Sequence, residues 1–83
     1  MKTVWIVQSD YHWLYGVFST SDGAVRGIKE MFQDIERWEN PVMNLSMDAT
    51  LLIAHSYSGG QAKKMVFFIK EWEIDIGRIM YVR

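Results

Sequence analysis

Residues 50–74, TLLIAHSYSGGQAKKMVFFIKEWEI, decide the fold, because two strand-like runs flank a pair of glycines there. The runs Thr50–Ser56 and Met65–Ile74 are rich in β-branched and aromatic residues, which favour strands. Gly59 and Gly60 can adopt the positive φ angles that tight hairpin turns require. We therefore predict an antiparallel hairpin that is closed by a glycine turn.

The same glycines, followed by a lysine pair, also resemble a phosphate-binding loop. Such loops bind best when a helix begins directly after the glycines and directs its positive end at the phosphate. Here the following residues are strand-like, and no second glycine precedes Lys63 at the spacing of a nucleotide-binding loop. We expect solvated lysines at a hairpin tip. A weaker hypothesis is that a small anionic ligand is held by Ser56, Tyr57, Ser58, Lys63 and Lys64.

Two further strands are predicted near the N-terminus. Thr3–Val7 is apolar on both alternating faces, as expected of a strand in the interior of a sheet. Trp13–Phe18 follows closely enough to return as the second strand of an antiparallel hairpin. Gly16 within it is expected to mark a bulge or a close approach of the backbone.

An amphipathic helix is predicted between these two hairpins. It begins in Ser19–Asp22, a run of helix-capping residues, and ends at Asn40, because the residue before Pro41 avoids the helical conformation. Gly27 is expected to permit close packing on a strand. The apolar face recurs at spacings of three and four residues and consists of Ala24, Val25, Ile28, Met31, Phe32, Ile35 and Trp38.

The chain as a whole is predicted to be one α+β domain over residues 1–83. Val42–Asp48 is interpreted as a weak edge strand, Asp75–Gly77 as a turn and Arg78–Val82 as a short last strand. We expect a mostly antiparallel sheet of four to five strands, with the order strand, strand, helix, strand, strand, and one helix on one face. A single helix cannot cover such a sheet, so the far face is expected to be wet or to form a homodimer interface.

The composition narrows the classes of function. The chain of 83 residues carries four Trp, four Tyr and four Phe, and 49% of it is hydrophobic. A small core does not absorb so much apolar surface, so part of it is expected to face a partner. The absence of cysteine excludes disulfides and thiolate metal sites, and the N-terminus lacks a signal-peptide core or a membrane span. We expect a cytoplasmic protein without a membrane partner.

The charge is nearly balanced in total but uneven along the chain. The net charge is −1, which argues against a dedicated nucleic-acid binder. Residues 1–50 carry a net charge of −3 and residues 51–83 one of +2. The alternative function is therefore a nucleic-acid-binding regulator that uses Lys63, Lys64, Arg78 and Arg83.

The first hairpin contains a cluster of candidate binding residues. Tyr11, His12, Trp13 and Tyr15 combine rings that can stack on bases or anchor a protein partner, although such rings can equally pack on their own sheet. His12 with Asp10 is a conceivable general-base pair. No paired histidine spacing and no glycine-flanked nucleophilic serine accompanies it, so we predict no enzyme, no metal site and no cofactor.

Glu71, Glu73 and Asp75 alternate with Trp72 and Ile74 in the last long run. In a strand this places the three carboxylates on one face. A cation site, a mimic of nucleic-acid phosphates and a contact for a basic partner all fit this stripe. A solvated strand end is the simpler interpretation.

Residues 4–32, VWIVQSDYHWLYGVFSTSDGAVRGIKEMF, and residues 67–75, FFIKEWEID, resemble a loose group of small uncharacterised proteins of bacteriophages and mobile elements. The matching positions are Gly16–Thr20, Ala24, Ile28 and Phe68–Asp75. The resemblance carries no catalytic residue. It implies a phage setting, in which small cysteine-free proteins act by binding a host component.

Together these observations predict a non-enzymatic binding protein, phage-encoded and homodimeric. It is expected to bind or sequester a host protein or a small anionic ligand. The predicted binding residues are Tyr11, His12, Trp13, Tyr57, Lys63 and Lys64.

Overall fold

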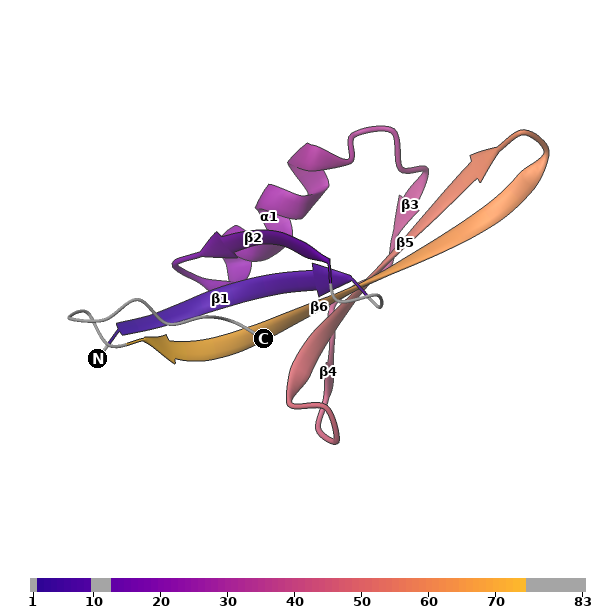
Figure 1. The fold of residues 1–83 in the computed structure, drawn as a ribbon. Coiled ribbons are helices and arrows are strands. Elements are labelled where there is room, and N and C mark those ends of the chain that lie inside the picture. Colours follow the sequence, from indigo (N-terminus) through magenta and orange to yellow (C-terminus); the bar gives the residue numbers. More distant parts are fainter. Residues whose placement is uncertain (1, 10–12, 75–83) are drawn as a thin grey trace.

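The computed structural model describes residues 2–9 and 13–74, which form one mostly antiparallel sheet with a helix on one face (Figure 1). The predicted α+β class is confirmed. The sheet is six-stranded with the order β2-β1-β6-β5-β3, and β4 also pairs with β5. The elements are β1 (Lys2–Ser9), β2 (Leu14–Phe18), α1 (Ser21–Met31), β3 (Arg37–Trp38), β4 (Val42–Asn44), β5 (Ala49–Ser58) and β6 (Gln61–Ile74).

The helix α1 begins where the sequence predicts it. The side chain of Thr20 caps it by accepting a hydrogen bond of 2.9 Å from the backbone N–H of Gly23. It ends far earlier than Asn40, because the backbone N–H of Phe32 closes its last turn on the carbonyl of Ile28. The prediction of a helix up to Asn40 is therefore wrong.

Pairing with β5 explains the early end of the helix. The N–H of Glu36 donates to the carbonyl of His55 at 3.0 Å, and the N–H of Glu39 donates to that of Ile53 at 2.9 Å. Ile35 and Trp38 still pack on the core, so apolar spacing persists after the helix has ended. This extra strand segment also makes the predicted count of four to five strands too low. The predicted order strand, strand, helix, strand, strand is wrong as well, because four strands follow α1 in the described part of the chain. The predicted last strand, Arg78–Val82, lies outside the described residues.

The predicted glycine hairpin is confirmed in β5 and β6. Gly59 and Gly60 have φ angles of 60° and 78°. A turn of this kind follows the natural twist of the strands, so the ladder continues to the Ser58↔Gln61 pair beside it. Lys63 and Lys64 consequently lie within β6 and not at the tip of the hairpin, which corrects the sequence prediction.

The first hairpin also forms as predicted, with β1 in the sheet interior between β2 and β6. The register shifts between Val7, which faces Gly16, and Gln8, which faces Leu14, so Tyr15 is the extra residue of a bulge. A Cβ on Gly16 would lie 2.8 Å from the ring of Phe18. The expected bulge is confirmed beside this glycine, and its close neighbour is the side chain of Phe18 and not another backbone segment.

The weak edge strand predicted at Val42–Asp48 is present as the shorter β4. After it, the side chain of Asn44 organises a turn by accepting hydrogen bonds from the hydroxyl of Ser46 at 2.7 Å and the N–H of Met47 at 3.2 Å. Asp48 closes the turn with a φ of 52°. The turn holds Leu45 in solvent, with 88% of the residue exposed.

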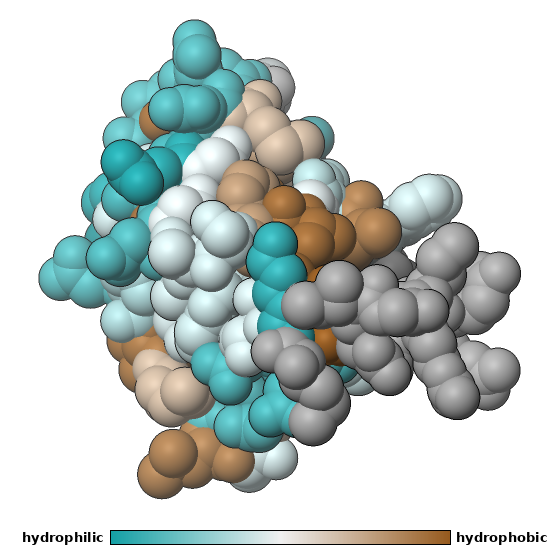
Figure 2. Space-filling model, turned by 90° about the vertical axis from the view of Figure 1, so that its left-hand side faces the viewer, coloured by the Kyte–Doolittle hydropathy of each residue, from teal (hydrophilic) through white to brown (hydrophobic). Residues whose placement is uncertain are grey.

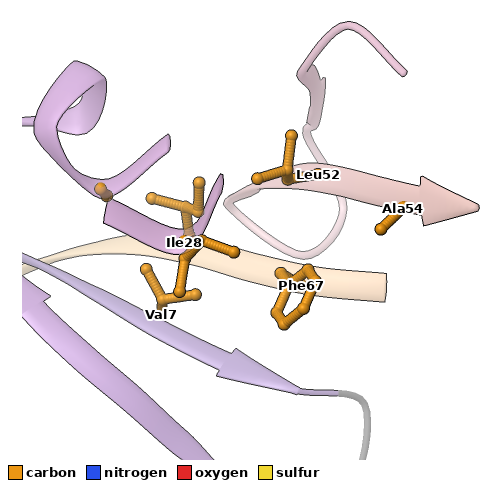
Figure 3. Close-up of a cluster of buried hydrophobic side chains, with 7 residues drawn as sticks. Val7, Ile28, Leu52, Ala54 and Phe67 are labelled. Carbon is orange, nitrogen blue, oxygen red and sulfur yellow. The ribbon is translucent and has the colours of Figure 1, made fainter. Parts of the chain in front are cut away.

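The core lies between α1 and the sheet (Figure 3). In Figure 3, Ile28 points from the helix toward Val7 and Phe67 on the sheet. The ring of Phe67 lies 5.3 Å from that of Tyr15 and 5.4 Å from that of Phe32, between ring centroids. The fully buried cluster consists of Val7, Ala24, Ile28, Leu52, Ala54, Phe67 and Ile69.

The sheet face away from α1 is also apolar. Val4 and Ile6 of β1 are buried there. Figure 2 views the end of the molecule at which β1 begins, and there brown apolar side chains lie in several groups among teal and white ones. The homodimer expected through this face stays a prediction. Further half-buried side chains of this face are Leu51, Ile53, Val66, Phe68 and Trp72.

Candidate binding site

A pocket of about 350 Å³ lies where β1 ends. One wall comes from the first hairpin and the other from β6, so Trp13 and Lys64, two predicted site residues, are brought together. The lining residues are Ser9, Trp13, Tyr15, Lys64, Met65, Val66 and Phe67.

Unequal strand lengths create this pocket. β1 stops at Ser9, which faces Phe67, whereas β6 continues past that point toward the glycine turn (Figure 1). Ser9 also positions Trp13, because its N–H donates to the carbonyl of Trp13 at 2.9 Å and its hydroxyl accepts from the N–H of Trp13 at 3.1 Å. These two hydrogen bonds hold the backbone of Trp13 beside Ser9, so the indole lies at the rim of the pocket.

The two aromatic rings of this hairpin that line the pocket, those of Trp13 and Tyr15, have different roles. Tyr15 packs edge-on against Phe32 and Phe67 and belongs to the core. Trp13 remains 70% exposed. Packing on the chain's own sheet, the alternative considered for the aromatic cluster, thus applies to Tyr15 and not to Trp13. Tyr11 and His12 lie outside the described residues.

The second predicted group is divided between the two faces of the sheet. Lys63 faces Ser56 and Lys64 faces His55 in the β5–β6 pairing, so the two exposed lysines point to opposite faces. Tyr57 is exposed and lies on the Lys64 face, opposite Ala62. This geometry does not direct the lysine pair at one compact anion.

One polar pair was missed by the sequence interpretation. The Nε2 atom of His55 lies 2.5 Å from the Oε2 atom of Glu39. The hydrogen bond from His55, aided by the nearby positive charges of Arg37 and Lys64, lowers the pKa of Glu39. Arg37, His55 and Lys64 face one another across three strands, so the carboxylate links β3 to the central hairpin.

Stability is expected to fall in acid because of this pair. A carboxyl group whose pKa is lower in the folded state stabilises the fold at pH values above its pKa in the unfolded chain, which is near 4.5. This contribution is lost as the pH falls through the pKa of the folded state. The wild type should thus be more stable than Glu39→Gln at neutral pH, and the difference should vanish in acid. Urea unfolding from pH 7 down to pH 3 measures this difference. The exposed Glu30→Gln is the matched control, and a pH-independent difference for Glu39→Gln would contradict the assignment.

The structure describes two of the three carboxylates of the acidic stripe, those of Glu71 and Glu73. Glu71 and Glu73 are exposed, whereas Trp72 and Ile74 between them are half-buried, which confirms the predicted alternation. Within residues 2–9 and 13–74, no three side chains of His, Asp or Glu are arranged to hold a metal ion. Asp75, Arg78 and Arg83 lie outside the described residues.

Comparisons with known proteins add no relative. No family model matches the chain, and neither the curated proteins nor the solved structures contain a significant match. The helix in the described part of the chain is too short to cross a membrane.

Proposed function

We propose that this chain is a non-enzymatic binding protein of a phage or mobile element, which occupies a host protein through the pocket between Trp13 and Lys64. The observation that carries the proposal is the pairing of an exposed indole with a lysine at one concave site. Tryptophan is among the residues that most often dominate binding energy at protein interfaces. The lysine adds a positive charge that selects an acidic group on the partner.

The openness of the site favours a protein over a small anionic ligand. Pockets for small molecules bury most of the ligand surface. Trp13 is instead 70% exposed, and the adjacent Leu14 and Val17 of β2 are more than half exposed as well. A surface of this kind gains most from a partner large enough to cover the indole.

Binding should depend on both walls of the pocket. We expect Trp13→Ala and Lys64→Glu each to raise the dissociation constant for the captured host protein by about tenfold or more, which corresponds to a loss of about 1.4 kcal/mol of binding free energy. Arg26→Glu, on the exposed side of α1, reverses an equal charge away from the pocket and should have no effect. The measurement is affinity capture from a host lysate with wild type and variants, followed by calorimetric titration of the captured protein.

Two results would refute the proposal. If both pocket variants bind with unchanged affinity, and circular dichroism shows that they keep the fold, the binding surface lies elsewhere. Capture of nucleic acid, with affinity that falls steeply as salt is added, would favour the alternative function of a nucleic-acid-binding regulator.

A further inference from the structure

We propose that the partner is bound as an added strand: an acidic, extended segment pairs with the edge of β6 along Ala62–Val66, in line with β1. This inference rests on the proposed function, because it assigns a binding mode to the same pocket. Strand addition of this kind obtains affinity from main-chain hydrogen bonds and specificity from alternate side chains.

The edge of β6 is open along this stretch. β1 pairs with Phe67–Ile74, and in the part of the chain that the structure describes no strand pairs with residues 61–66 on that side. Figure 1 shows the β5–β6 hairpin projecting beyond the end of β1. An unpaired strand edge is a template for another chain, and proteins normally cover or blunt it.

The hairpin register tells which backbone groups face outward. The Ser58↔Gln61 pair closes the glycine turn and exchanges hydrogen bonds, so Lys63 and Met65 also bond to β5. The residues between them direct their N–H and C=O groups to the open edge. These residues are Ala62, Lys64 and Val66.

The pocket lies on this edge. Its β6 wall consists of the consecutive residues Lys64–Phe67, so the strand edge itself forms the wall. Trp13 and Tyr15 form the other wall. A chain that pairs with β6 on this side at Lys64–Val66 would lie at the ordinary spacing of paired strands from it, between the two walls.

The lysines of β6 indicate that the bound segment is acidic. Residues 61–70 of β6 include Lys63, Lys64 and Lys70 and no acidic residue. An added strand alternates its side chains, so it can place an acidic residue beside Lys63 on one face and beside Lys64 on the other, which a compact anion cannot do. A second copy of this chain fits poorly, because symmetric antiparallel pairing about Lys64 would set that lysine against its own copy.

The test uses phage-displayed random octapeptides selected on the full chain. Enriched peptides should carry Asp or Glu at two consecutive positions, which lie beside Lys63 and Lys64 on opposite faces of the sheet. Val66→Pro removes one outward N–H from the edge and should bind these peptides about tenfold or more weakly than Val66→Ala, which loses the same side chain but keeps that N–H. N-methylation of alternate peptide residues should abolish binding, and methylation of the intervening residues should not. This peptide series keeps the test valid even where Val66→Pro disturbs the fold.

The outcomes separate this inference from the proposed function. Peptides that need Trp13 and Lys64 but tolerate N-methylation at every position overturn strand addition and leave the binding site in place. Binding that ignores Trp13 and Lys64 refutes the proposed function as well. If no peptide is enriched, the edge of β6 does not bind an acidic segment. If the wild type forms a dimer that Val66→Pro dissociates, the occupant of the edge is a second copy of the chain and not an acidic segment.

Discussion

Replacing Phe67 with alanine is expected to lower the free energy of unfolding by about 3–5 kcal/mol. Phe67 is 1% exposed and ranks first by volume among the fully buried side chains of the described residues. Its ring contacts those of Tyr15, Phe32 and Trp38, which come from three separate segments. Alanine would therefore remove buried apolar surface and leave a cavity where β2, the end of α1 and β3 meet.

This loss is large relative to the total free energy of unfolding of a small domain. Domains are typically stable by only about 5–15 kcal/mol, so Phe67→Ala should remove a large share of the total. Urea unfolding followed by circular dichroism measures the midpoint and the slope. Phe67→Leu retains most of the volume and should cost less than about half as much.

Phe68→Ala provides the matched control for this substitution. Phe68 is the adjacent residue in the same strand, points to the other face and is only half-buried. A loss for Phe67→Ala no larger than that for Phe68→Ala would show that the core does not centre on the helix side of the sheet.

Local signals in the sequence predicted those parts of the fold that depend on a few neighbouring residues. The glycine turn at residues 59–60 depends on the φ angles of those two residues. The helix start depends on Thr20 and the N–H of Gly23, three residues apart. These features can be predicted because no distant strand has to be positioned first.

The end of the helix and the presence of β3 depend on distant partners. Ile35 and Trp38 continue the apolar spacing of α1, so the pattern alone favours a longer helix. Hydrogen bonds from Glu36 and Glu39 to β5 override this pattern. The sequence does not reveal which strand lies beside residues 36–39, and the prediction failed at that point.

The candidate site divides in the same way. Trp13 and Lys64 stood out by residue type, but only the different lengths of β1 and β6 place them at one pocket. The opposite directions of Lys63 and Lys64 follow from strand pairing that continues to the glycine turn. The link between His55 and Glu39 carried no local signal, because it requires the register of β3 on β5.

Gly27→Val is expected to destabilise the fold by about 1–3 kcal/mol, although valine is the better helix former. Helix propensity alone favours valine over glycine by less than about 0.5 kcal/mol. A Cβ at this position would overlap the ring of Phe18, which also lies against Gly16 on its other edge. The ring is held between helix and strand, so the cost of overpacking, about 1–3 kcal/mol, exceeds the gain in propensity.

A double-mutant cycle isolates this contact. Phe18→Ala removes the ring, so Gly27→Val should become nearly neutral in that background, and the coupling between the two positions should be about as large as the overpacking cost. Arg26→Val, at the adjacent exposed helix position, is the matched control and should cost only about 0.5 kcal/mol through helix propensity. Equal costs for Gly27→Val with and without the Phe18 ring would contradict the close packing of α1 on β2. The predicted coupling follows because glycine at residue 27 lets the helix approach β2 closely enough to enclose the ring of Phe18.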